Sequence, residues 1–167
     1  MKKIISYILF ILVLFLLQTC LFSHFALGGI QPNLLLIFTA SAAIINGSLD
    51  GCAVGFCCGL LIDLTFGTQP GLMALGLCIC GYLAGMTNRF FYKEDITFPI
   101  LVIAGADLLL GLYIYIVSFL TRGRQHILFY LHRIILPEVV YTVIIAVFLY
   151  RIILFILVRM QKKGSER

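Results

Sequence analysis

The chain has 167 residues, of which 62% are hydrophobic and only 11% are charged, whereas a soluble domain carries about a quarter charged residues. This composition excludes a water-soluble globular protein and indicates an integral membrane protein with one helical domain over residues 1–167. The net charge of +5 lies mostly at the chain ends. No basic face with interleaved aromatic residues is present, so nucleic acid is excluded as a partner, and contact with the lipid bilayer is favoured.

Apolar segments in chain order predict an all-α compact bundle of about six transmembrane helices. The first segment, at about 4–22, is longer than the core of a signal peptide and is predicted to remain as an uncleaved helix. The other five segments are 30–45, 49–66, 72–87, 98–120 and 139–158. Because a spanning helix needs about 20 residues, the second, third and fourth segments are near or below the limit, and we expect them to be tilted, half-buried or in a thinned bilayer.

The connections and flanking charges predict the topology. Short links make the second, third and fourth helices antiparallel neighbours. Basic residues at both chain ends place both termini in the cytoplasm. The loop 121–136 then lies outside, although it contains three arginines. Its run ILFYLHRII is amphipathic and is predicted to lie in the outer membrane interface.

Glycines recur at four-residue intervals in the third segment, and the fourth segment repeats the spacing. In lipid, small residues at this interval form a ridge against which a second helix backbone can approach closely. We therefore predict a packing surface, used either inside the monomer or by a partner's membrane helix. Its members are Gly47, Gly51, Gly55, Gly59, Gly81 and Gly85.

Four charged residues are predicted to lie within the membrane. Asp63 continues the glycine ridge and is expected to bond to backbone groups of the following TFGTQPG turn, with a proton or ligand site as the alternative. Asp107 and Arg151 have similar predicted depths and are expected to pair. In the alternative, Arg151 extends to the interface, and Asp107 is protonated or bonds to a neighbour such as Tyr141. Glu138 is the fourth.

The residue types needed for catalysis or metal binding are not clustered in the sequence. Six cysteines lie inside apolar runs without a paired CxxC motif or a nearby histidine, so we interpret them as small packing residues. The three histidines lack clustered carboxylate companions. No catalytic residue, metal site or cofactor is therefore predicted.

One long motif resembles a known family. The run GLLIDLTFGTQPGLMALGLCICGYLAGMTNR, residues 59–89, is similar to the central signature of the rod shape-determining protein MreD family. QTCLF, QPNLLLIF and LPEVVYTVI also resemble segments of that family. One position departs from the pattern: the family commonly has Asp after the proline of QP, and Asn33 stands there in this chain. A charged role at that position is therefore not expected.

The resemblance implies a fold similar to the substrate-binding subunits of energy-coupling-factor transporters. It also implies a non-enzymatic scaffold in the bacterial cytoplasmic membrane that binds MreC and helps to maintain rod shape. Further implied partners are MreB and the polymerase and transpeptidase of cell-wall elongation. The alternative function is a vitamin-binding transporter subunit, which needs several convergent polar groups. The candidates for such groups are sparse: Gln18, Asn46, Gln69, Asp63 and His24.

Overall fold

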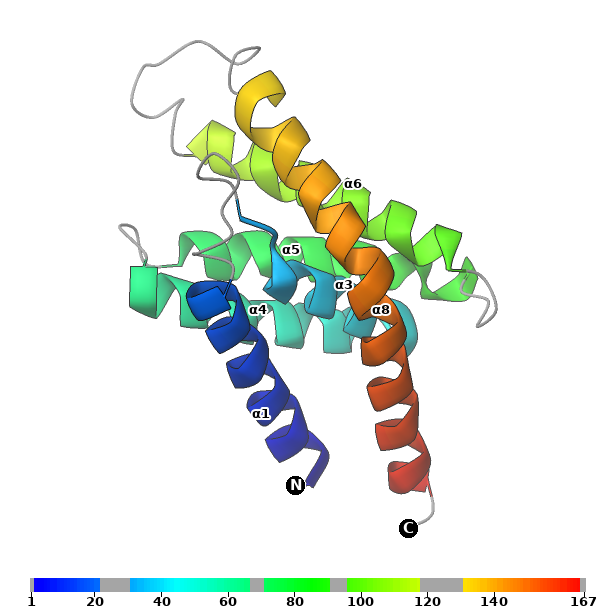
Figure 1. Cartoon of the computed structure of the whole chain (residues 1–167). Coiled ribbons are helices and arrows are strands. Elements are labelled where there is room, and N and C mark those ends of the chain that lie inside the picture. The colour runs from blue at the N-terminus through cyan, green and yellow to red at the C-terminus, as the bar shows by residue number, and fades with distance from the viewer. Residues whose placement is uncertain (1, 22–30, 67–70, 91–95, 118–130, 166–167) are drawn as a thin grey trace.

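The computed structural model describes residues 2–21, 31–66, 71–90, 96–117 and 131–165, and all regular structure within these ranges is helical (Figure 1). Six α-helices lie there, in agreement with the six predicted apolar segments. They are α1 (Lys2–Leu16), α3 (Leu34–Asn46), α4 (Ser48–Phe66), α5 (Leu72–Met86), α6 (Thr97–Tyr115) and α8 (Leu136–Ser165). Short helical turns adjoin them: η1 (Leu17–Leu21), η2 (Thr87–Phe90) and η4 (Leu131–Ile135).

Three helical segments are long and apolar enough to cross a membrane: Ser48–Phe66, Thr97–Tyr115 and Arg133–Ile156. The third predicted segment is thus long enough to span. The second is not, because α3 has only 13 residues. At about 1.5 Å per residue this helix is about 20 Å long, whereas the hydrocarbon core of a bilayer is about 30 Å thick.

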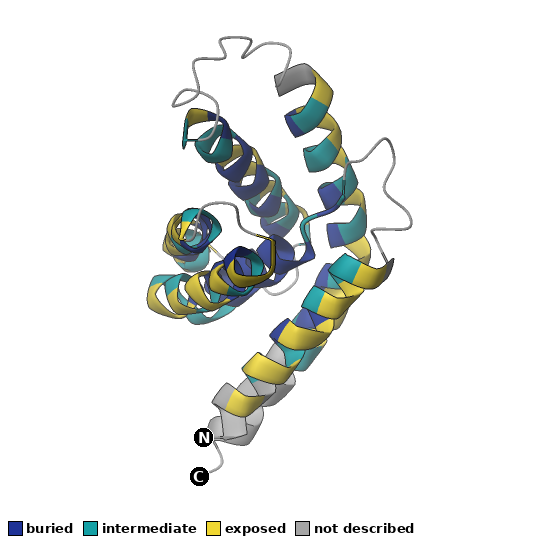
Figure 2. Ribbon diagram, turned by 90° about the vertical axis from the view of Figure 1, so that its left-hand side faces the viewer, coloured by how far each residue is buried: buried dark blue, intermediate teal, exposed yellow. Residues whose placement is uncertain are grey.

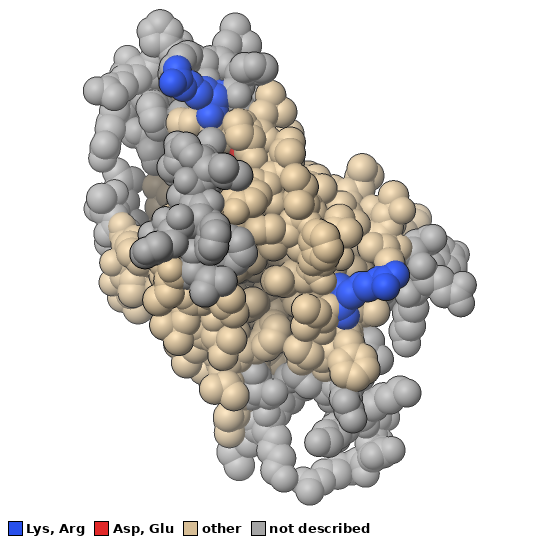
Figure 3. Space-filling model, viewed as in Figure 1, with Lys and Arg blue, Asp and Glu red and all other residues tan. Residues whose placement is uncertain are grey.

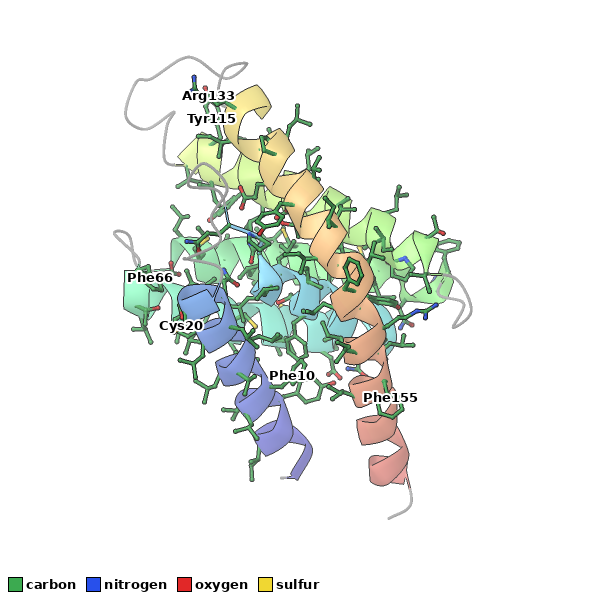
Figure 4. The ribbon with its side chains drawn as sticks, viewed as in Figure 1. Phe10, Cys20, Phe66, Tyr115, Arg133 and Phe155 are labelled. Atoms are coloured by element: carbon green, nitrogen blue, oxygen red, sulfur yellow. The ribbon has the colours of Figure 1, made fainter. Side chains whose placement is uncertain are left out.

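The short helix α3 occupies the middle of the molecule. It contacts each of the other five α-helices, and all its residues from Leu34 to Ile44 are buried. Figure 2 shows the buried positions concentrated around it, whereas α1 and α8 carry exposed residues along their outer sides. From α1, Phe10 (Figure 4) packs on Phe38 of α3 with the ring centroids 5.0 Å apart.

Apolar side chains also cover much of the outer surface. Large exposed apolar residues occur on α1, α4, α5, α6 and α8, for example Leu9, Phe56, Leu101 and Phe148. Figure 3 shows basic side chains at two separate places on one face, with an uncharged surface between them. A helical protein that is apolar both inside and outside fits lipid as its solvent, so the structure agrees with a membrane protein.

The two chain ends lie on the same side of the molecule. The start of α1 and the end of α8 point to the same end of the molecule in both views (Figures 1 and 2). Much of the predicted outer loop, including the first four residues of the run ILFYLHRII, lies in residues 118–130, outside the described residues. The end of that run forms η4, which continues directly into α8.

Candidate functional site

A three-helix junction of α3, α4 and α5 uses the predicted glycines. A Cβ atom on Gly55 of α4 would lie 2.3 Å from the Leu77 carbonyl oxygen, and one on Gly81 of α5 would lie 2.3 Å from that of Gly51. The methyl group of Thr39, from α3, lies 3.0 Å and 2.9 Å from these two Cβ positions. Real Cβ atoms cannot approach a backbone oxygen this closely, so the three backbones meet because side chains are absent.

Two further contacts extend this packing along α4 and α5. A Cβ on Gly59 would lie 2.4 Å from the Cα of Ala74, and one on Gly85 would lie 2.2 Å from the Cα of Ser48. The two helices therefore touch at both ends as well as in the middle. In this structure the glycine ridge faces α3 and α5 inside the chain.

Gly47 differs from the other predicted ridge residues. It lies between α3 and α4 with φ 105°, and nothing lies within 4 Å of its Cβ position. Its backbone still takes part in the contact between α4 and α5, because its carbonyl carbon lies 2.8 Å from the Cβ position of Gly85. Its N–H donates to the Ala43 carbonyl at 2.8 Å and its own carbonyl accepts from Gly51 at 3.0 Å. Glycine is needed here because L side chains rarely adopt this backbone conformation.

Both ends of α3 are capped by side chains. At the start, the Asn33 side-chain oxygen accepts from the Leu36 N–H at 3.1 Å, and Gln18 of η1 accepts from Leu35 at 3.2 Å. At the end, the Asn88 amide of η2 donates to the Ile44 carbonyl. Sequence reasoning gave Gln18 only as a candidate pocket residue and missed Asn88. Asn33 is a good N-cap residue, and its amide oxygen makes the cap without a charge.

Asp63 caps the start of α5 from the preceding helix. Its carboxyl oxygens accept the N–H groups of Gly71 at 3.0 Å, Met73 at 3.1 Å and Ala74 at 2.9 Å. The side chain is 8% exposed, and Gly71 has no capping side chain of its own. The expectation that Asp63 bonds to backbone groups of the following turn is confirmed. It stabilises α5 because a helix start leaves unpaired donors.

Asp107 lies at the contact between α6 and α8. Its side chain is 3% exposed and is hydrogen-bonded to the Thr142 hydroxyl. That hydroxyl also accepts the Asn33 N–H at 3.3 Å, which links the pair to the start of α3. The other carboxyl oxygen, Oδ2, is buried without a hydrogen-bond partner.

The expected pair of Asp107 and Arg151 is not formed. Arg151 is exposed, whereas Thr142, which meets Asp107, is 0% exposed. Arg151 comes nine residues after Thr142 in α8, and at about 100° per residue this places it on the opposite side of the helix. Nine residues also correspond to about 13.5 Å along the axis of α8 at about 1.5 Å per residue, so both depth and rotation separate the two charges.

The polar residues considered for a ligand pocket do not converge. Gln18 caps α3, Asn46 donates to the Tyr7 hydroxyl at 2.7 Å and Asp63 caps α5. Gln69 and His24 lie outside the described residues. Within the described ranges, His, Cys, Asp and Glu form no group of three suited to a metal ion, and all six cysteines are free thiols.

The apolar helices pack through glycine contacts around a short buried helix. This arrangement is that of a helical integral membrane protein. A scan against protein-family models matches the rod shape-determining protein MreD over residues 1–161. The chain therefore belongs to the MreD family, and this membership supports a role in rod shape determination. Comparisons with curated proteins and with solved structures gave no match. The expected similarity to energy-coupling-factor subunits stays a prediction.

Substitution of a ridge glycine tests the three-helix junction. Gly55→Ala places a Cβ against the backbone of α5 and is expected to destabilise the protein by about 1–3 kcal/mol, as overpacking does. The matched control is Gly105→Ala in α6, where nothing lies within 4 Å of the new atom. The measurement is the thermal unfolding midpoint of each purified variant in detergent. Equal midpoints for the two variants would show that Gly55 makes no close contact.

Proposed function

We propose that this chain is a non-enzymatic membrane scaffold of the bacterial cell-wall elongation machinery, which binds MreC and helps to maintain rod shape. The observation that carries the proposal is the family match over residues 1–161. Membership of a family of shape-determining proteins favours assembly with other components over catalysis. MreB and the cell-wall polymerase and transpeptidase are proposed as members of the same assembly.

The composition of the interior supports a scaffold over a vitamin-binding subunit. A small-molecule site needs several polar groups directed into one cavity. In the described part of the chain, the buried polar or charged residues are Thr39, Ser41, Asp63, Asp107 and Thr142. Thr39 and Ser41 donate to carbonyls of their own helix, and Asp63 caps a helix. Most of the buried polar groups are thus already hydrogen-bonded within one helix or between helices.

The outer surface supports a partner that lies in the membrane. Exposed apolar side chains such as Phe56, Leu83, Leu109 and Phe148 occur on four different helices. Lipid and the membrane helix of a partner are equally apolar, so partner binding depends on shape and on a few polar contacts. We propose that MreC contacts one of these faces, because the glycine ridge is used inside the chain.

We further propose a multi-pass protein of the cytoplasmic membrane with both termini in the cytoplasm. Two observations support this topology. The start of α1 and the end of α8 lie on the same side of the molecule (Figure 1), and both chain termini are rich in lysine and arginine. Fusion of alkaline phosphatase to the C-terminus should give an inactive enzyme, whereas green fluorescent protein should fluoresce there. An active phosphatase fusion would contradict this topology.

Crosslinking in cells tests the MreC proposal. A photoreactive amino acid is placed singly at Phe56, Leu83, Leu109 and Phe148, which lie on four outer faces. At least one position should give a covalent product with MreC after irradiation, because a bound partner helix covers one face. Ile37 is 0% exposed and serves as the buried control, from which no product is expected.

A second experiment distinguishes the scaffold function from that of a vitamin-binding transporter subunit. The purified protein is heated with and without vitamins. A ligand at about 100 times its dissociation constant stabilises a folded protein by about 2.7 kcal/mol, which would raise the unfolding midpoint. No rise is expected. Stabilisation by a vitamin, together with no MreC product from any exposed position, would contradict the proposed function.

A further inference from the structure

One carboxyl oxygen between α6 and α8 is not used by the packing described above. Asp107 of α6 is 3% exposed, and its Oδ2 atom is buried without a hydrogen-bond partner. Glu138, on α8, interacts electrostatically with Asp107 and is half-buried. It precedes Thr142 by one helical turn, so it lies on the side of α8 that meets Asp107. Two carboxyl groups therefore lie on the same contact between α6 and α8.

Acidic groups act on Asp107 from two neighbouring helices. Among the described residues, Glu138 of α8 and the Cys80 thiol of α5 interact electrostatically with it. Arg151 is on the opposite side of α8, as shown above. The start of α3 is close, but its Leu35 and Leu36 N–H groups already donate to side chains. Two ionised carboxylates at this place would repel each other in a medium that solvates charge poorly.

The burial of Asp107 limits which positive species can neutralise the carboxyl pair. A lipid amine or a lysine of a partner helix cannot reach Oδ2 without opening the contact between α6 and α8, because Asp107 is almost fully buried. A divalent metal is disfavoured because no group of three suitable ligands is found among the described residues. Ca²⁺ and Mg²⁺ take about six or more oxygen ligands, which two carboxyl groups and one hydroxyl cannot provide. A proton needs only the carboxyl oxygens themselves.

We propose that Asp107 and Glu138 form a proton-binding site inside the helix bundle. The unpartnered Oδ2 of Asp107 and the Glu138 carboxyl share one proton, while the Thr142 hydroxyl holds the other oxygen of Asp107 in place. Loss of that proton introduces a second negative charge between α6 and α8. The contact between these two helices is therefore weaker at alkaline pH. This inference does not depend on the proposed role in cell-wall elongation.

Dicyclohexylcarbodiimide tests the site, because it is apolar enough to enter a membrane and reacts with protonated carboxyl groups. The carboxyl O–H adds across one C=N bond of the reagent, and rearrangement gives a stable N-acylurea with no leaving group. The full chain in lipid nanodiscs is treated at neutral and at alkaline pH, and peptides are analysed by mass spectrometry. Modification is expected at Asp107 or Glu138 at neutral pH and should be lost at alkaline pH.

Asp63 provides an internal control in the same membrane. It is also buried, but its oxygens already accept three backbone N–H groups, so it is expected to stay unmodified. No reaction at Asp107 or Glu138 at neutral pH, together with an equal fall of the unfolding midpoint with pH in the unsubstituted protein and the double variant described below, would overturn the proposal. Protection of either residue by sodium ions at constant pH would also overturn it, because an alkali cation would then occupy the site.

A second measurement does not depend on access of the reagent. The unfolding midpoint of the unsubstituted protein should fall as the pH rises, because the folded state binds a proton that the unfolded state has released. In the double variant Asp107→Asn with Glu138→Gln, this part of the pH dependence should be lost. The same fall in both proteins would contradict a proton shared by the two carboxyls. Asp50→Asn, at an exposed position of α4, is the matched control and should behave like the unsubstituted protein.

Discussion

The rest of the structure depends on one helix that is buried on every side, because its backbone ends need hydrogen-bond partners from other parts of the chain. The helix α3 has eleven consecutive buried residues, from Leu34 to Ile44, and it is too short to reach both sides of a bilayer. Its terminal N–H and C=O groups therefore cannot rely on water, and an unsatisfied backbone group in such a place costs several kcal/mol. Side chains of Asn33, Gln18 and Asn88 supply the missing partners.

Close packing around α3 explains how the other residues are used. Glycine in α4 and α5 lets two backbones meet each other and the Thr39 methyl group of α3 at once. Asp63 then fixes the start of α5 relative to the end of α4. Most buried polar groups are thus used for internal structure, which is consistent with a scaffold whose outer surface meets lipid and partners. Asp107 is the exception, and its free oxygen leads to the proposed proton site.

Much of the fold could be predicted from the sequence, because apolar runs and turn residues mark helices in lipid reliably. The glycine spacing correctly indicated a ridge, but a four-residue period cannot distinguish Gly51, inside a helix, from Gly47, in a turn with positive φ. The predicted pair of Asp107 and Arg151 is not formed, because Asp107 meets α8 at Thr142, about two and a half turns before Arg151, and sequence spacing does not fix how two helices are placed along and around each other. The caps of α3 by Gln18 and Asn88 join residues far apart in the chain, and no local pattern reports such contacts.

Apolar photolabelling from the lipid phase tests most directly the claim that α3 is enclosed by the other helices. A carbene reagent dissolved in the bilayer of nanodiscs is activated by light, and labelled residues are mapped by mass spectrometry. The account predicts label on outward residues such as Leu9 of α1 and Phe148 of α8, which are exposed, and no label between Leu34 and Ile44. Label within α3 at a level similar to that on α1 would contradict it.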